Sequence, residues 1–230
     1  MGGIMFLRKR TTQAEYFDGL RPREELKDFY RSLERVNRFF INGEPFQRMI
    51  PRLLGPDACR QLRLLDLGAG DGTLGKELTM WARKRGWEWT VTSLDFNPTA
   101  LGLGGGERVA GSAVDLPFLD DTFDVVIASQ MTHHLQCTKI PRHFAESWRV
   151  ASKAVLISDL HRNALLYATL FVTLRLQGHS RDFIEDALLS VQRGWRVAEL
   201  RELTKKSGIA QLKVHLYFGA RVLVMGRKLS

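Results

Sequence analysis

Hydrophobic and polar positions divide the middle of this chain into apolar runs that alternate with amphipathic segments. Residues 74–84 and 141–150 place apolar side chains at the three- and four-residue spacing of a helix. Between such segments lie five runs of strand-like length, the third of them short: residues 62–67, 89–94, 108–111, 124–129 and 154–159. This alternation predicts an α/β fold, a parallel sheet with right-handed crossovers.

Two places depart from the simple alternation. Residues 97–106 hold Pro98 and four glycines, and each interior glycine costs about 1 kcal/mol against alanine in a helix, so we expect a truncated or distorted helix there. Near the end of the chain, runs at 211–218 and 221–227 are joined only through Gly219-Ala220. A connection this short permits only an antiparallel pair.

Helical sequence precedes the alternating region and interrupts it once. Apolar residues form a stripe along residues 24–40, and Pro45 opens a second helix through Leu54. A second helical stretch, residues 160–192, follows the fifth strand. We therefore predict an N-terminal helical cap over residues 1–60, a core made of residues 61–159 and 193–230, and a helical lid inserted at residues 160–192.

Composition and charge narrow the class of protein. A chain of 230 residues with 44% hydrophobic residues fits one soluble α/β domain with a cap, and no stretch is long and apolar enough to span a bilayer. The net charge of +9 lies in the flanks, because residues 64–147 carry more acidic than basic side chains. Basic flanks leave open a solvated surface, an anionic substrate, a membrane surface or a nucleic acid. No dense Lys/Arg run with interleaved aromatics occurs, which disfavours RNA.

The two cysteines, Cys59 and Cys137, belong to no metal or redox motif. Their sparse use predicts a reduced, cytoplasmic setting without a structural metal.

Three glycines follow the first strand at alternate positions, Gly68, Gly70 and Gly72. Glycines at such a turn let the backbone approach a ligand closely, and the free N–H groups of the next helix point to the same place. Asp95 ends the second apolar run, 23 residues after Gly72. A carboxylate at that distance is suited to holding two ribose hydroxyls, so this region predicts a nucleoside-binding βαβ unit.

Four segments, matching in order and spacing, resemble the motifs of class I S-adenosylmethionine-dependent methyltransferases: residues 65–72, 94–98, 111–118 and 123–129. Within that family the chain is similar to the small-molecule group that includes ubiquinone/menaquinone-type enzymes. The resemblance implies a Rossmann-like methyltransferase fold with a seven-stranded, mostly parallel sheet and an antiparallel last strand. It also implies S-adenosylmethionine as cofactor. An NAD site is disfavoured, because its glycines usually follow Gly-x-Gly-x-x-Gly and it needs no acid at the position of Asp66.

The resemblance also assigns cofactor contacts. It places the glycine turn beside the methionine part and Asp95 on the ribose hydroxyls, with Phe96 against the adenine. Asp66 either orients the glycine turn or holds the cofactor amino group through water. The full predicted set is Asp66, Gly68, Ala69, Gly70, Gly72, Asp95, Phe96, Ser112, Ala113, Gln130 and Met131.

Ser112 departs from the family pattern, which commonly has Asp at this position. Serine accepts a hydrogen bond from the adenine amino group without charge assistance. Either the Ala113 backbone holds the adenine in part, or Asp115 replaces the missing acid. We therefore expect a cofactor affinity lower than is usual for the family.

Three histidines are candidates for a general base, since imidazole accepts protons near neutral pH. His161, just past the fifth strand, is favoured by its position, with Asp159 and Arg162 flanking it to orient it or to pair with an anion. His133 and His134 follow the fourth strand, and a structural hydrogen bond competes with catalysis for each. The two are adjacent on the chain and lack a nearby acidic ligand, so no metal is predicted.

The function that follows is methyl transfer to oxygen or carbon of a small aromatic, polyketide-like or quinone-like acceptor, because the predicted cap and lid are apolar. Alternatives are an RNA or protein methyltransferase that uses the basic flanks, a non-catalytic cofactor-binding protein, and an enzyme in peripheral contact with a membrane. The sequence lacks the Asn/Asp-Pro-Pro-Tyr type of motif typical of methylation of base amino groups. It leaves open the acceptor, the atom methylated and the oligomeric state.

Overall fold

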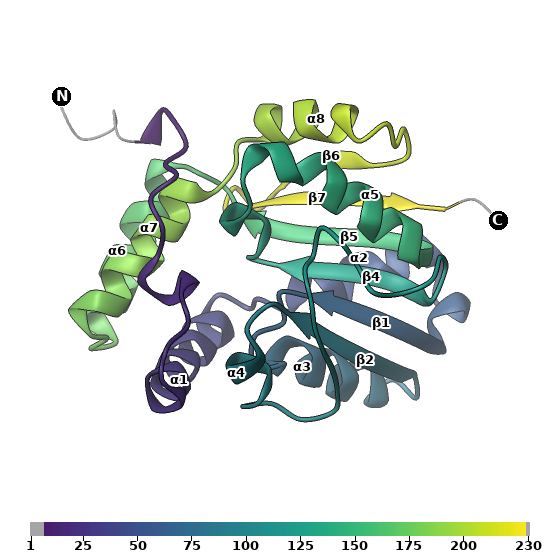
Figure 1. Ribbon diagram of the computed structural model, residues 1–230, viewed down its shortest axis with the longest axis horizontal. Coiled ribbons are helices and arrows are strands. Elements are labelled where there is room, and N and C mark those ends of the chain that lie inside the picture. The colour runs from purple at the N-terminus through teal and green to yellow at the C-terminus, as the bar shows by residue number, and fades with distance from the viewer. Residues whose placement is uncertain (1–6, 229–230) are drawn as a thin grey trace.

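Seven strands form one mixed sheet in the order β3-β2-β1-β4-β5-β7-β6 (Figure 1). The computed structural model describes residues 7–228. The strands are β1 (Gln61–Leu67), β2 (Glu88–Asp95), β3 (Glu107–Ala110), β4 (Phe123–Ser129), β5 (Ala151–Leu160), β6 (Lys213–Tyr217) and β7 (Arg221–Arg227). Strand β7 runs antiparallel to β5 and β6, and the other pairs are parallel. The predicted sheet is confirmed.

Strand register brings the carboxyl ends of the central strands to one edge. Leu67 of β1 is level with Leu94 of β2 and with Ala128 of β4, and Ala128 is level with Ile157 of β5. In open parallel sheets this edge is where ligands bind. The strand order extends from β1 to β2 on one side and from β1 to β4 on the other. The topological switch point of the sheet therefore lies at the end of β1, at the glycine turn after Leu67.

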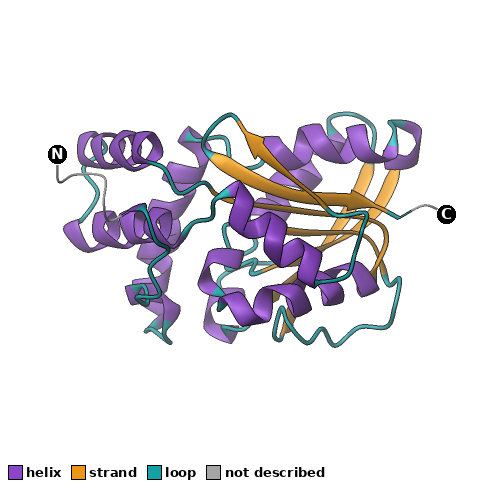
Figure 2. Ribbon diagram, turned by 90° about the horizontal axis from the view of Figure 1, so that it is seen from above, coloured by secondary structure: helices purple, strands orange, loops and turns teal. Residues whose placement is uncertain are grey.

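Helices cover both faces of the sheet (Figure 2). Alternation along β4 sends Val125 to one core and Val126 to the other. The first core is closed by α2 (Glu44–Leu54) and α3 (Thr73–Arg83), and the second by α5 (Ile140–Val150) and α8 (Val197–Lys206). Short 3-10 turns lie at Tyr16–Asp18, Asp57–Cys59, Thr132–His134 and Cys137–Lys139.

The crossover from β2 to β3 contains only the one-turn helix α4 (Pro98–Leu101), which confirms the truncation expected from its glycines. Asn97 caps this turn by accepting hydrogen bonds from the N–H groups of Thr99 and Ala100.

A third core lies beyond the carboxyl edge of the sheet, at the left in Figure 1. Helices α1 (Arg23–Phe39), α6 (Ala164–Leu176) and α7 (Arg181–Arg193) pack there through side chains such as Val36, Leu170 and Ile184. The chain before α1 runs against α7, where the carboxylate of Asp186 accepts hydrogen bonds from the N–H groups of Tyr16 and Phe17. The predicted division into cap, core and lid includes residues 1–6 and 229–230, which lie outside the described residues, and it stays a prediction. Within residues 7–228, no helix has the length and apolarity to cross a bilayer.

Candidate cofactor and acceptor site

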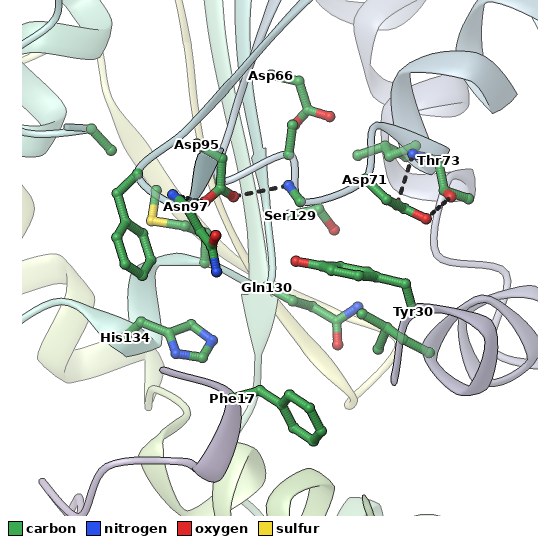
Figure 3. Close-up of a pocket in the computed structure, with 18 of the residues that line it drawn as sticks. Phe17, Tyr30, Asp66, Asp71, Thr73, Asp95, Asn97, Ser129, Gln130 and His134 are labelled. Carbon is green, nitrogen blue, oxygen red and sulfur yellow. Dashed lines mark hydrogen bonds between the residues drawn. The ribbon is translucent and has the colours of Figure 1, made fainter. Parts of the chain in front are cut away.

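A cavity of about 500 Å³ opens at the carboxyl edge of the sheet. Its walls come from the loops after β1, β2 and β4, from α1 and from the N-terminal segment around residues 15–18 (Figure 3). The structure brings to this cavity most of the predicted site residues: Asp66, Gly68, Ala69, Gly70, Asp95, Phe96, Ser112, Ala113, Gln130, Met131, His133 and His134. Gly72 and His161 are not among its lining residues.

The glycine turn requires glycine for both conformation and space. Gly68 and Gly70 have φ of +69° and +57°, in the left-handed region. A Cβ on Gly70 would lie 2.6 Å from the Tyr30 ring, and one on Gly68 would lie 2.2 Å from Cγ of Met131. Gly72, with φ of +76°, begins α3 as its N-terminal cap residue. The turn is therefore tightly packed against α1 and the loop after β4.

Asp95 joins the loops that follow β1 and β2. Its carboxylate accepts hydrogen bonds from the N–H of Gly70 at 2.9 Å and from the N–H of Asn97 at 2.8 Å. Burial raises the pKa of Asp95. A carboxylate has about four acceptor positions, so these two bonds leave capacity for ligand hydroxyls. Phe96, 64% exposed, stands beside it at the cavity rim.

Asp66 is the least satisfied acid in the cavity. It is buried at the end of β1, and its Oδ2 has no hydrogen-bond partner. Burial, reinforced by repulsion from Asp95 and Asp71, raises the pKa of Asp66 to about 8. A buried, unpaired acid that faces a cavity suits a cationic ligand group. The ammonium group of S-adenosylmethionine has this chemistry, so the residues present fit the implied cofactor.

The predicted adenine side is only partly free. Ser112 Oγ accepts a hydrogen bond from the N–H of Val114 at 3.3 Å, and the carbonyl of Ala113 lies 2.9 Å from Nδ1 of His143. Asp115, weighed above as a substitute acid, is not among the lining residues and pairs with Arg142 at 3.0 Å. It therefore adds no acid to the adenine side of the cavity.

The backbone of Gln130 is strained, and hydrogen bonds fix its side chain. Its φ of +50° is unusual for a residue with a side chain. Its Nε2 donates to Oδ1 of Asn37 and of Asn42, each at 3.0 Å. These bonds tie the end of β4 to the last turns of α1 and to the turn that follows α1.

His133 is held by a buried carboxylate. Its Nδ1 lies 2.6 Å from Oδ1 of Asp159, whose Oδ2 accepts from the N–H of His133 at 2.8 Å and from the hydroxyl of Thr132. Burial acts to raise the pKa of Asp159, but the charge and hydrogen bonds of His133 and Thr132 outweigh it and hold the pKa far below its usual range. With Nδ1 occupied, Nε2 of His133 has no hydrogen-bond partner and lies 3.6 Å from Oε1 of Glu15.

His161 lies elsewhere. Its Nδ1 is 2.8 Å from the carbonyl oxygen of Gly219, in the turn between β6 and β7. The two residues predicted to serve it have other partners, because Asp159 holds His133 and the buried Arg162 pairs with Glu199. The chain leaves the sheet after Leu160, which carries His161 away from the cavity.

The remaining histidine, His134, lies 2.5 Å through Nδ1 from Oδ1 of Asp18. Three potential metal ligands lie close together, one atom each from Glu15, His133 and His134. The three atoms lie within 4.8 Å of one another, and such a group can hold a metal ion. A guanidinium nitrogen of Arg193 already lies 3.3 Å from Oε1 of Glu15 and 2.5 Å from Asp18. Because that cation balances the acids, we interpret the group as an acid–base cluster, and the expectation of no metal stays a prediction.

Comparison with known proteins agrees with this geometry. Residues 65–157 match the family described as "Methyltransferase domain". This segment, less than half of the chain, resembles a methyltransferase domain. The matched segment begins within β1 and ends within β5, at Ile157. It contains the glycine turn and Asp95, and it stops before Asp159.

Two curated relatives of the methyltransferase domain are demethylmenaquinone methyltransferases. The protein from Roseiflexus sp. (strain RS-1) is 32% identical over 111 residues, which cover 47% of this chain and 45% of the relative. The protein from Roseiflexus castenholzii is 33% identical over 106 residues, or 43% and 41% of the two chains. The alignments thus span less than half of these relatives.

Solved structures share the fold of the methyltransferase domain. One, described as a putative S-adenosyl-L-methionine-dependent methyltransferase from Methanococcus maripaludis, has a TM-score of 0.63 at 13% identity and covers 92% of this chain and 98% of its own. Human N-acetylserotonin methyltransferase, solved with SAM, has a TM-score of 0.62 at 15% identity, over 91% and 57% of the two chains. Identities this low show the fold alone.

Sequence reasoning missed many residues that line the cavity, among them Glu15, Tyr30, Asn37 and Asn42. These four come from the helical flank, where no motif marks them. The amphipathic stripe of residues 24–40 gave the one usable signal, because it predicted that α1 packs with one face against the rest of the molecule.

Proposed function

We propose that the protein uses S-adenosylmethionine to methylate an oxygen or carbon of a small aromatic or quinone-like acceptor, with His133 as the general base. The observation that carries this proposal is the buried Asp159–His133 pair, because His133 lines the same cavity as the glycine turn and its Nε2 makes no hydrogen bond. His133 replaces His161 as the favoured base, since His161 does not line that cavity.

The cofactor would lie across the ends of β1 and β2. In this proposal Asp66 receives the ammonium group, Asp95 the ribose hydroxyls, and Phe96 with Ser112 and Ala113 the adenine. The unpaired Oδ2 of Asp66 and the spare acceptor positions of Asp95 support these roles. S-adenosylmethionine supplies a methyl group on a positive sulfur and leaves as a neutral thioether.

The protein's own part is to align the acceptor, take its proton and exclude water. Nε2 of His133 would take the proton from an acceptor hydroxyl. Asp159 would keep the proton of the neutral ring on Nδ1 and stabilise the imidazolium that forms, as a buried carboxylate does in other Asp–His pairs. The fully buried position of Asp159 supports this role, because an acid there interacts strongly with its partner.

The helical flanks would form the acceptor side. We propose that α1 with the N-terminal segment acts as a cap, and that α6 and α7 act as the lid. Phe17, Phe29 and Leu33 give the cavity an apolar wall suited to an aromatic ring. The curated relatives are demethylmenaquinone methyltransferases by name, which supports a quinone-like acceptor class.

The central test compares His133→Ala with His161→Ala. Methyl transfer from radiolabelled S-adenosylmethionine to a hydroxynaphthalene acceptor is measured, and cofactor affinity is measured by calorimetry. We expect His133→Ala to lose at least about a hundredfold in kcat, the usual share of a general base, with cofactor affinity unchanged. His161→Ala should keep its turnover. The reverse pattern would return the base to His161, and failure to bind the cofactor at all would remove the proposed activity.

The outer face of α6 supports peripheral contact with a membrane as part of this proposal. Leu165, Val172 and Leu176 share that face and are 78%, 53% and 84% exposed. Residues 160–181 contain no Asp or Glu, and their arginine on α6 itself is Arg175. An exposed apolar face without acidic side chains would favour contact with an anionic bilayer surface, while the rest of the molecule, with its two free cysteines, is in keeping with the cytoplasm. Flotation with anionic and with neutral vesicles tests the contact, and equal flotation with both would count against it.

A further inference from the structure

The part of the cavity beside His133 and Glu15, called here the acceptor end, is acidic although the protein as a whole is basic. The chain carries a net charge of +9, yet the described residues that line the cavity include no Lys or Arg. Beside His133 the acids that line the cavity are Glu15 and Asp18. We infer that the acceptor is an uncharged or cationic aromatic hydroxyl compound that donates hydrogen bonds to Glu15 and His133, and that anionic acceptors are rejected. This inference rests on the proposed function.

Two guanidinium groups that contact the wall of the cavity, those of Arg193 and Arg10, are occupied by protein partners. Arg193 is buried, and its nitrogens bond to Asp18, Glu15 and the carbonyl of His133. Arg10 donates to the carbonyls of His133 and Leu135 and stacks its guanidinium on Trp195. Neither group is free to pair with a carboxylate or phosphate in the cavity.

Glu15 and His133 approach each other at the wall of the cavity. Nε2 of His133 is buried without a hydrogen-bond partner and lies 3.6 Å from Oε1 of Glu15, beyond hydrogen-bond range. Oε1 makes no hydrogen bond but is ion-paired with Arg193 at 3.3 Å. Oε2 of Glu15 is already satisfied by the hydroxyl of Ser190 at 2.7 Å. When the proton of the neutral ring is on Nδ1, toward Asp159, Nε2 of His133 is an acceptor. A donor such as a phenolic hydroxyl therefore suits it.

The wall beside these atoms selects for a flat ring. Phe17 and Phe29 stack with ring centroids 4.0 Å apart and planes inclined by 26°. Both rings line the cavity, and Figure 3 shows Phe17 at its lower side, below His134 and Gln130. An aromatic acceptor can extend this stack while its hydroxyl reaches His133.

Charge decides which aromatic acceptors enter. Glu15 and Asp18 share the single guanidinium of Arg193, so the pair of acids exceeds the one positive charge that faces them. An acceptor carboxylate beside them would meet this excess negative charge, and the repulsion at an effective dielectric of about 20 would weaken its binding. It would also bring no donor to Nε2 of His133. A cationic substituent at the acceptor end would instead be attracted by the acids there.

The experiment uses three matched acceptors with the wild-type protein: 2-naphthol, 6-hydroxy-2-naphthoate and 6-aminomethyl-2-naphthol. We expect kcat/KM for the naphthoate to be at least about tenfold below that for 2-naphthol, mainly through KM, and the amine to equal or exceed 2-naphthol. The same order is expected when binding to the protein saturated with S-adenosylhomocysteine is measured by calorimetry. A naphthoate that binds as well as 2-naphthol, or no binding of any of the three, would overturn the inference. Loss of S-adenosylmethionine binding would instead defeat the proposed function.

A variant pair assigns the effect to Glu15. Glu15→Gln keeps the side-chain size and should reduce the discrimination against the naphthoate at least about threefold with an unchanged Kd for S-adenosylmethionine. The control is Glu185→Gln, an exposed acid of α7 that pairs with Arg181 and does not line the cavity. Its discrimination should match that of the wild type. If both variants behave alike, Glu15 does not set the preference.

Discussion

Oδ1 of Asp159 lies 2.6 Å from Nδ1 of His133, and both side chains are buried. The pair joins the end of β5 to the turn after β4 and leaves the second ring nitrogen of His133 without a hydrogen bond. A carboxylate in this position fixes which nitrogen carries the proton of the neutral ring.

Replacing Asp159 with Asn tests this relationship directly. The amide keeps the shape of the side chain but cannot stabilise an imidazolium, so kcat should fall about a hundredfold or more while the Kd for S-adenosylmethionine stays within about twofold. Single-turnover kinetics and calorimetry measure the two quantities. A matched control is Asp124→Asn, an acid at the opposite end of β4 that pairs with Lys153. Equal losses in both variants would indicate a folding defect.

The raised pKa of Asp66, about 8, gives a prediction for pH. Its pKa in the unfolded chain is about 3.9, so the folded state binds the extra proton between these values. The favourable contribution of the protonated acid is fully present below about pH 4 and is lost as pH rises through about 8. The free energy of unfolding of the wild type should therefore fall relative to that of Asp66→Asn as the pH rises from 4 to 8. Urea denaturation measures both values. A difference that stays constant over this range would contradict the assignment.

Cofactor binding should also release protons from Asp66. An ammonium group beside the carboxylate favours its charged form, so binding of S-adenosylmethionine at pH 7 should release protons. Calorimetry in buffers with different ionisation enthalpies measures the number. We expect release by the wild type and much less by Asp66→Asn, and equal release would place the ammonium elsewhere.

Gly70 should be irreplaceable for reasons of space. A Cβ there would meet the Tyr30 ring at 2.6 Å, and φ is +57°. Gly70→Ala should weaken cofactor binding more than tenfold, beyond the roughly 1 kcal/mol of left-handed strain. Gly86→Ala is the control, because its φ is +71° and nothing lies within 4 Å of its Cβ position. If Gly86→Ala weakens binding as much, contact with Tyr30 is not the cause.

Ser112→Asp should strengthen cofactor binding several-fold. An aspartate would accept the adenine hydrogen bond with charge assistance, and Asp115 does not line the cavity to supply that charge. Titration with S-adenosylmethionine measures the gain. Unchanged or weaker binding would mean that Ser112 does not contact the adenine.

Removal of divalent cations should leave methyl transfer unchanged. Arg193 already balances Glu15 and Asp18 at the cluster that includes His133, so no second cation is needed there. Dialysis against EDTA followed by the transfer assay tests this. Activity that is lost and then restored by one divalent metal would make Glu15, His133 and His134 its ligands.

What could be predicted from the sequence depended on distance along the chain. The glycine turn and Asp95 were predicted together because one βαβ unit fixes their separation, and the structure joins them through the N–H of Gly70. The start of β5 was placed three residues late, because Ser152 and Lys153 are polar although they continue the strand.

Asp159 shows where such reasoning failed. It was expected near the site, but with His161, its neighbour in sequence. The structure pairs it with His133 because β4 and β5 are adjacent strands whose ends meet at one edge of the sheet. Glu15 carried no signal at all, since it reaches His133 only through the packing of the N-terminal segment on α7.

The sequence by itself determined the sheet and the glycine turn, because strand alternation and short-range spacing are local properties of the chain. Its resemblance to a known family predicted the class of methyl donor. Tertiary structure alone decided which histidine faces the cavity and which acid holds it. It also decided the charge around the acceptor. These depend on contacts between segments far apart in sequence, Glu15, His133 and Asp159, which only the packed sheet and its helical flank bring within hydrogen-bonding or ion-pairing reach.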